Sequence, residues 1–255
     1  MITAVDLASS ERPYCDARLL LREFTHRINN EFASAMGVIA VAAARSRNHE
    51  VKATLAAVEQ HLESCAQMHH ALQMPEHGTC IDAAVYLRQV CCAISRAMLD
   101  HRAIELLIVE RSFRMESERC WRLALIVSEL ITNAARHAFD RGPRPRLIKV
   151  ELQPSAAFAK CRISDNGSSD TNIAAGCGLR IVDGLAKSLG GTIHHRFGPR
   201  GGRSVLIFPI GQERSENKWL AGSKSHHLAS AALSSLDSPP YQRGRRGRDA
   251  ACSSV

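Results

Sequence analysis

The chain has 255 residues, a hydrophobic content of 45% and a formal net charge of +8. No stretch approaches the roughly 18 consecutive apolar residues of a membrane span, and the first residues lack the basic-then-apolar order of a secretion signal. These features argue against a membrane-embedded or secreted protein, and we expect one or two globular domains in the cytoplasm.

The cysteines, histidines and basic residues show no pattern typical of a metal or nucleic-acid site. The nine cysteines include no CxxC pair, and several lie in apolar helical patterns, which favours buried, reduced thiols. The histidine pairs at 69–70 and 194–195 are adjacent, so their side chains diverge on a helix or a strand. Much of the basic excess lies in YQRGRRGRDA near the C-terminus. We therefore favour a solubilising tail over a nucleic-acid-binding protein.

Two consecutive helices are predicted in the first third of the chain. Apolar residues recur every three or four positions from about Arg18 to Arg47, and again from Val51 to Leu72. The short polar connection SRNHE joins the two helices into a hairpin. A single hairpin would leave one apolar face bare, and pairing two copies into a four-helix bundle would cover it. The pattern predicts a homodimer.

After the break at MPEHGTC, helical and strand patterns alternate. Helices are predicted over IDAAVYLRQVCCAISRAML, SERCWRLALIVSELITNAARHAF and GCGLRIVDGLAKSLGG. Strands are predicted over AIELLIVE, RLIKVELQ, FAKCRISD, TIHHRF and RSVLIFPI, the last two joined across GPRGG. These proportions predict a two-layer α/β sandwich after the hairpin, so the fold class is α+β. The expected parts are an N-terminal extension (1–14), the hairpin (15–76), the sandwich (77–211) and a disordered basic tail (212–255).

The first predicted helix carries a histidine among polar neighbours. In REFTHRINNEF, His26 lies almost opposite the apolar stripe, with Glu23 and Asn30 about one turn away on the same side. An exposed imidazole on a rigid helix can act as a nucleophile toward phosphorus. For an isolated histidine, an ordinary surface position would be the better interpretation.

The long helix of the sandwich carries a polar face. In SELITNAARHAF, Glu129, Asn133 and His137 repeat every four residues, while the apolar residues between them can face the core. An asparagine oxygen can bind Mg²⁺, and a nearby glutamate can orient or deprotonate a nucleophile. A helix with a merely solvated face is the alternative.

Two glycine-containing segments follow. Asp165 ends a predicted strand and can accept a hydrogen bond from an exocyclic amine, while Gly167 permits a positive φ and the close approach of a ligand. Gly176 and Gly178 precede the next helix, whose free N–H groups favour phosphate, and Arg180 can add charge. Taken singly, a common turn and a weak GxG pattern explain these residues equally well.

The order of these motifs resembles the sensor histidine kinases, most closely the HWE-type and related subfamily with an HRxxN phosphorylation box. EFTHRINN is similar to the phosphorylation box and SELITNAARHAF to the N box. SDNG is similar to the first glycine box and GCGLRIVDGLAKSLGG to the second. The resemblance covers roughly residues 15–210.

The resemblance implies a dimerisation and phosphotransfer hairpin followed by an ATPase domain of the Bergerat type, with ATP and Mg²⁺ as cofactors. It implies that His26 accepts phosphate, that Asn133 binds Mg²⁺ and that Glu129 is its acid–base neighbour. It also implies that Asp165 contacts the adenine amine and that the glycines at 167, 176 and 178 shape the nucleotide pocket. The phosphoryl group would then pass to an aspartate of a response-regulator receiver domain.

The sequence departs from the common pattern at three places. Arg27 follows His26 where many histidine kinases have an acid, as the subfamily pattern allows, so Glu23 and Glu129 both stay candidate bases. Ser169 stands at the second glycine of the DxGxG box, and the segment 168–175 is short for a mobile lid.

Two other functions therefore stay open. One is a histidine phosphotransferase that relays phosphate without ATP, and the other is a non-catalytic, nucleic-acid-binding regulator. The sequence contains no recognisable sensor domain, so we expect either that a separate sensor protein supplies the input or that the protein is not a signal-gated kinase.

Overall fold

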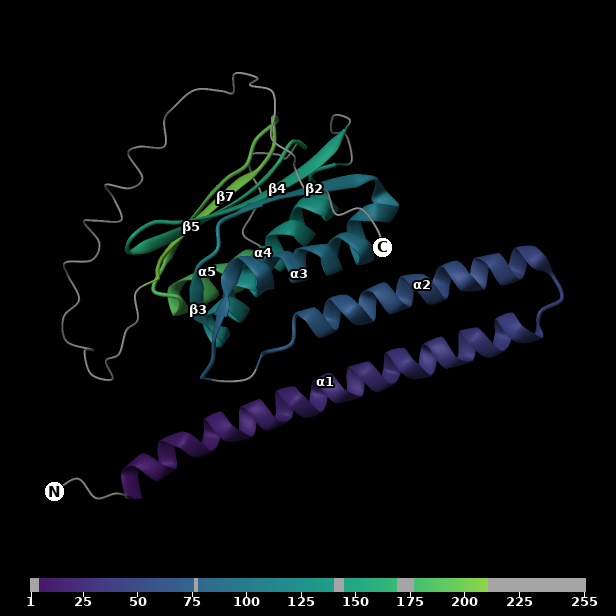
Figure 1. The fold of residues 1–255 in the computed structure, drawn as a ribbon, viewed down its shortest axis with the longest axis horizontal. Coiled ribbons are helices and arrows are strands. Elements are labelled where there is room, and N and C mark those ends of the chain that lie inside the picture. Colours follow the sequence, from purple (N-terminus) through teal and green to yellow (C-terminus); the bar gives the residue numbers. More distant parts are fainter. Residues whose placement is uncertain (1–4, 76–77, 140–144, 169–176, 211–255) are drawn as a thin grey trace.

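A computed structural model describes residues 5–75, 78–139, 145–168 and 177–210, with side chains described from Glu23 onward (Figure 1). The predicted tail at 212–255 lies outside the described residues. The chain forms a long helical hairpin followed by helices packed on a β-sheet, as the sequence predicts.

The hairpin consists of α1 (Val5–Arg45) and α2 (His49–Ala71), which lie side by side along the length of α2 (Figure 1). Asn48 begins α2, because its side-chain oxygen accepts hydrogen bonds from the backbone N–H groups of Glu50 (2.8 Å) and Val51 (3.4 Å). The first helix begins at Val5 rather than near Arg18. The apolar stripe marks only the part of a helix that has a packing partner, so it underestimated the helix and the N-terminal extension is helical from Val5.

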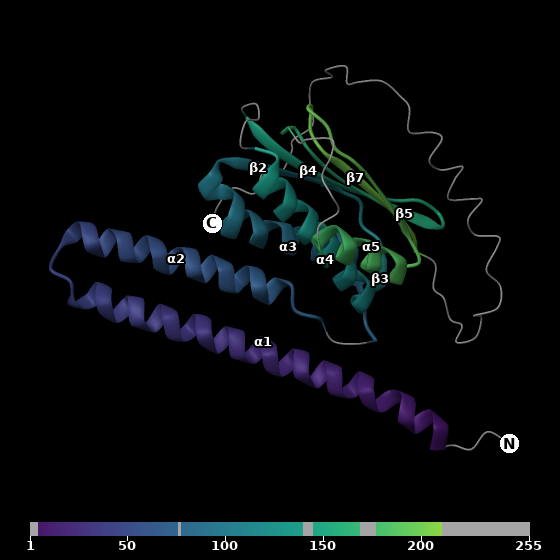
Figure 2. The same ribbon diagram turned by 180° about the vertical axis from the view of Figure 1, so that it is seen from behind.

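The second part contains a five-stranded sheet in the order β2-β4-β5-β7-β6. Its strands are β2 (Ile104–Glu110), β4 (Arg146–Pro154), β5 (Phe158–Asp165), β6 (Thr192–Arg196) and β7 (Arg203–Pro209). Neighbouring strands are antiparallel except for the parallel pair β2–β4. The helices α3 (Ala83–Ile94), α4 (Ser117–His137) and α5 (Cys177–Ser188) cover one face of this sheet (Figures 1 and 2). The predicted two-layer sandwich is confirmed.

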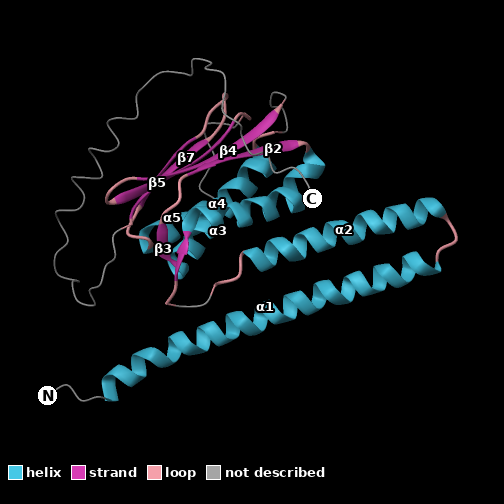
Figure 3. Ribbon diagram, viewed as in Figure 1, coloured by secondary structure: helices cyan, strands magenta, loops and turns pink. Residues whose placement is uncertain are grey.

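A small second sheet was not predicted. β1 (Cys80–Asp82) pairs with β3 (Arg114–Glu116), where the sequence pattern predicted that a helix begins at Ile81 (Figure 3). Asp82 instead caps α3 through bonds to the N–H groups of Ala84 (2.8 Å) and Val85 (3.2 Å). This pairing involves residues more than thirty positions apart, so no local pattern reveals it.

The core lies between the sheet and its helices. Alternate residues of β4 (Ile148, Val150 and Leu152) have no exposed surface, and neither do Leu206 and Phe208 of β7. The period-two burial of β4 is typical of a strand with one covered face, whereas the five consecutive residues from Ser204 to Phe208 of β7 are all buried. The core thus fixes which face of each strand meets α4, the helix that carries the predicted polar face.

The hairpin is attached to the sandwich through α2, which packs against α3. Trp121 of α4 donates a hydrogen bond from its indole nitrogen to the carbonyl of Leu72 (2.8 Å). The hydroxyl of Tyr86 on α3 lies 3.3 Å from the carbonyl of Ala71 and 3.4 Å from that of Gln73. Burial raises the pKa of Tyr86 to about 12, so the hydroxyl stays a hydrogen-bond donor. Sandwich side chains therefore satisfy carbonyls that end a helix.

Candidate nucleotide site

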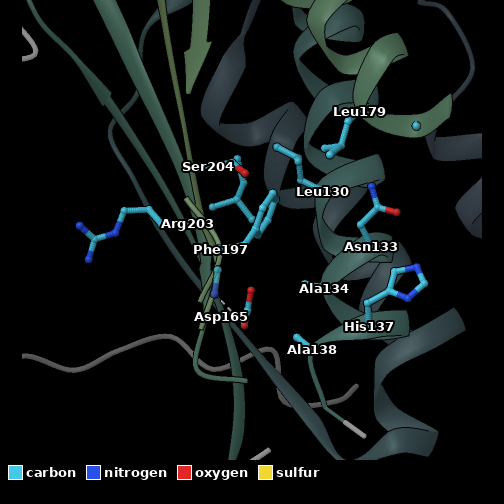
Figure 4. Close-up of a pocket in the computed structure, with 13 residues that line it drawn as sticks. Leu130, Asn133, Ala134, His137, Ala138, Asp165, Leu179, Phe197, Arg203 and Ser204 are labelled. Carbon is cyan, nitrogen blue, oxygen red and sulfur yellow. Dashed lines mark hydrogen bonds between the residues drawn. The ribbon is translucent and has the colours of Figure 1, made fainter. Parts of the chain in front are cut away.

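A cavity of about 300 Å³ lies between α4 and the adjacent ends of β5, β6 and β7 (Figure 4). Its apolar lining comes from Leu130, Ala134, Ala138, Ile163, Leu179 and Phe197. Its polar and glycine lining comes from Asn133, His137, Asp165, Gly178, Gly202, Arg203 and Ser204. Largely apolar walls with a few polar groups are typical of a small-molecule site.

Asp165 is the acidic group of this cavity. One carboxylate oxygen, Oδ1, accepts hydrogen bonds from the backbone N–H groups of Gly167 (3.0 Å) and Gly202 (3.1 Å). Burial raises the pKa of Asp165 above its ordinary value, against the opposing effect of these bonds. The two backbone bonds fix the carboxylate plane and leave Oδ2 for a ligand that donates a hydrogen bond.

The backbone of the turn between β6 and β7 passes very close to Asp165. Gly201 has a φ of +114°, and a Cβ atom there would lie 2.1 Å from the carbonyl oxygen of Asp165. A Cβ atom at Gly202 would lie 2.6 Å from Oδ2 of Asp165. Only glycine allows this approach without displacing the carboxylate, so the GPRGG segment is part of the site and more than a hairpin turn.

Gly167 has a different role from the predicted one. Its φ is not in the positive region, and it does not line the cavity. A Cβ atom there would lie 2.1 Å from the carbonyl oxygen of Ala138. Glycine is therefore needed because the loop after β5 passes close to the end of α4, where Ser168 N–H also bonds the Ala138 carbonyl (2.8 Å).

The polar face of α4 borders the cavity. Asn133 and His137 both line it, one turn apart on the same helix (Figure 4). Glu129 precedes Asn133 by four residues on α4 and is therefore one turn earlier. The Asn133 amide nitrogen donates to Glu129 Oε1 over 3.3 Å, so the amide oxygen is available as a ligand for a hard cation such as Mg²⁺. A Cβ atom at Gly178 would lie 2.1 Å from the same Glu129 oxygen. The start of α5 therefore packs directly against this face.

The remaining predicted nucleotide residues are placed as follows. Gly178 lines the cavity, whereas Gly176 lies outside the described residues. Arg180 is exposed and does not line the cavity, so its prediction from proximity in sequence gains no support. Arg203 is the basic residue of the lining, although Figure 4 shows its guanidinium pointing away from α4.

The predicted phosphorylation box lies apart from the cavity. His26, Glu23 and Asn30 are all exposed on α1, and both views show α2 between α1 and the sandwich (Figures 1 and 2). Glu23 Oε1 accepts a hydrogen bond from Arg27 Nε over 3.0 Å. Within the described part of the chain, no hydrogen bond joins His26 to Glu23 or Asn30. The structure therefore brings Glu23 to Arg27 rather than to the imidazole.

Sequence reasoning missed the lining residues Phe197, Gly202 and Ser204. They belong to β7 and the segment before it, and the pairing of β5 with β7 brings Ser204 opposite Ile163. The available signal was the glycine pair at 201–202, since two adjacent glycines in a hairpin connection indicate close backbone approach.

Comparison with known proteins gives a consistent family assignment. A histidine kinase family model matches residues 23–98, and a model of the histidine kinase-like ATPase domain matches residues 101–206. The sensor histidine kinase PdtaS of Mycolicibacterium smegmatis is 27% identical over 203 residues, covering 75% of this chain and 40% of that protein. The blue-light-activated histidine kinase 2 of Erythrobacter litoralis is 24% identical over 224 residues, covering 83% of this chain and 63% of that protein.

Among solved structures, the histidine kinase domain of the Erythrobacter litoralis EL346 blue-light-activated histidine kinase matches with a TM-score of 0.48 and 20% identity. The match covers 70% of this chain and 96% of that one. The chain thus spans less than half the length of the mycobacterial relative, although it contains both matched domains.

No group of three or more His, Cys, Asp or Glu side chains in the described ranges could hold a metal ion. No helix among the same residues combines the length and hydropathy of a membrane span.

Proposed function

The chain belongs to the histidine kinases, and we propose that it is an ATP-dependent protein-histidine kinase of a two-component system. The observation that carries this proposal is the Asp165 carboxylate, which is fixed by two backbone N–H groups at the wall of an apolar cavity. Such a carboxylate can accept a hydrogen bond from the exocyclic amine of adenine, while the apolar walls can enclose the flat base.

The residues present fit Mg·ATP. Leu130, Ile163 and Phe197 offer apolar walls for the base, and the Asn133 amide oxygen, oriented by Glu129, is the proposed Mg²⁺ ligand. When bound, Mg·ATP would supply the phosphoryl group for transfer. The chain contributes positioning and charge neutralisation, which account for most of the catalysis of phosphoryl transfer.

His26 is the proposed phosphoryl acceptor. Its exposed position on α1 suits both attack on phosphorus and later access by a response-regulator receiver domain. We assign the acid–base role to Glu129 rather than Glu23, because Arg27 already engages the Glu23 carboxylate. Since α2 lies between α1 and the sandwich, transfer requires either a rearrangement of the sandwich or a His26 supplied by a partner subunit.

The proposed partners follow from the same arrangement. The hairpin would pair with that of a second copy to form a four-helix bundle, and the receiver domain would dock beside His26 on its exposed side. Nucleic acid is not a proposed partner.

Incubation of the purified chain with γ-³²P-ATP and Mg²⁺ tests this function. We expect acid-labile, alkali-stable label on the wild type, at least about 100-fold less on His26→Gln, and a comparable loss on Asn133→Ala. His49→Gln, which changes another exposed hairpin histidine, is the matched control and should label normally.

A wild type that takes no label from ATP would contradict the kinase proposal. If that chain still accepted phosphate on His26 from a phosphorylated receiver domain, it would be a phosphotransferase. Label that persists on His26→Gln would place the acceptor elsewhere.

A further inference from the structure

His195 contacts two of the residues that line the proposed nucleotide cavity, although it does not line the cavity itself. It is on β6, and the sheet register places it opposite Ser204 of β7. Its ring nitrogen Nδ1 is 2.8 Å from the hydroxyl oxygen of Ser204, which is only 4% exposed and lines the cavity. The same imidazole stacks on Phe197, another lining residue, with ring centroids 5.9 Å apart and planes 9° apart. One side chain therefore supports two residues of the cavity wall.

The surroundings of His195 determine which ring nitrogen carries the proton. The side chain is 17% exposed, and burial lowers the pKa of His195 despite the nearby Asp183 carboxylate on α5, which favours the neutral ring. Nε2 lies 3.8 Å from Asp183 Oδ1 and has no hydrogen-bond partner within the described residues. A proton on Nε2 is attracted by this carboxylate, whereas a lone pair there would be repelled. Nδ1 is then the hydrogen-bond acceptor.

This tautomer fixes the direction of the serine hydroxyl. Because Nδ1 accepts, the Ser204 O–H must donate to it and cannot donate into the cavity. Only lone pairs of Ser204 Oγ then face a ligand. Asp165, on the same wall, also offers an accepting oxygen, so both polar groups present acceptors.

We propose that His195 is a positioning residue that holds Ser204 as a hydrogen-bond acceptor and thereby makes the cavity select 6-aminopurine over 6-oxopurine nucleotides. The inference rests on the proposed nucleotide site. A 6-amino group can donate hydrogen bonds to the oxygens of Ser204 and Asp165. A 6-oxo group has no N–H at this position and would place its own lone pairs against those of Ser204. Without His195 the hydroxyl can rotate and donate to a 6-oxo group, so the discrimination weakens.

The test compares the affinities of the full-length chain for ADP and IDP, which differ at position 6 of the purine, by isothermal titration calorimetry. For the wild type we expect tighter binding of ADP. In His195→Phe, which keeps an aromatic ring beside Phe197, the ratio of the IDP to the ADP dissociation constant should fall about two- to tenfold, as expected for one hydrogen bond. His195→Asn should keep the wild-type ratio, because its amide oxygen can accept from Ser204 in place of Nδ1.

Ser204→Ala is the second variant and should lower the ratio as His195→Phe does. Adding His195→Phe to Ser204→Ala should change the ratio no further, because both substitutions act through the same hydroxyl. An unchanged ratio in Ser204→Ala, or equal losses in His195→Phe and His195→Asn, would overturn the inference while leaving the proposed kinase intact. A wild type that binds neither nucleotide would overturn both.

Discussion

The hairpin and the sandwich use their apolar residues in opposite ways. In the sandwich, Leu206 and Phe208 are completely buried between the sheet and the helices. In the hairpin, α2 has no buried residue, and Phe24 and Val38 of α1 are 63% and 69% exposed. The sandwich has a complete core within one chain. The two helices of the hairpin each carry an apolar stripe, and they cannot bury both stripes completely against each other. The difference supports the proposal that the hairpin pairs with a second copy, whereas the sandwich depends on its own packing.

The largest expected effect is on the core of the sandwich. Phe208→Ala should lower the free energy of unfolding of the sandwich by about 3–5 kcal/mol, because it removes a fully buried ring and leaves a cavity. Phe24→Ala, the same substitution at an exposed position of the hairpin, should change the free energy of unfolding of the sandwich by less than about 0.5 kcal/mol. Urea unfolding followed by near-ultraviolet circular dichroism at low protein concentration measures both. Equal effects would mean that the two regions unfold as one unit.

The next effect concerns association through the hairpin. Replacing both Val38 and Val41 by Glu should raise the dimer dissociation constant at least about 100-fold, because the carboxylates would have to be buried between the two copies. Val109→Glu is the control, since it adds charge at a 39% exposed position of the sandwich. Sedimentation velocity across a concentration series reports the dissociation constant. A double variant that dimerises like the wild type would show that another surface pairs the chains.

The smallest effect is a pH dependence confined to the sandwich. Burial raises the pKa of Asp165, so its ionised form destabilises the folded state at neutral pH. Asp165→Asn should therefore raise the melting temperature at pH 7, and this gain should shrink as the pH falls toward the ordinary pKa of 3.8, below which both states are protonated. Glu31→Gln, which changes an exposed hairpin carboxylate, is the matched control. A melting temperature of Asp165→Asn at or below that of the wild type at pH 7 would contradict the prediction.

Local patterns were sufficient for most of the fold. Apolar periodicity predicted α4 and its polar face, and the alternation in FAKCRISD predicted a strand that ends at Asp165. The pairing of β1 with β3 was not predicted, because it depends on residues far apart in the sequence. The start of α1 at Val5 was missed for a different reason, since no apolar stripe marks its first residues.

The sequence predicted residues of the cavity lining only where the residue and its signal lie in one motif. The structure places Asn133, His137, Asp165 and Gly178 along one cavity, each within a recognised motif. Ser204 was missed because it comes from the other side of a hairpin, and only the β6–β7 register brings it to His195. Arg180 was expected from its closeness to a glycine pair in sequence, yet the direction of a helix turns it to solvent. The roles of these residues in catalysis stay predictions.

The attachment of α2 to the sandwich has a consequence for how a signal could travel. Trp121 and Tyr86 bond the carbonyls of Leu72 and Ala71, so the last turn of α2 is held by side chains of two different sandwich helices. A rotation of α2 about its own axis would move these carbonyls away from both donors at once and leave them to be hydrated. Such a rotation would therefore cost the free energy of both hydrogen bonds together. The end of α2 is thus the place where a change in the hairpin would first be felt by α3 and α4.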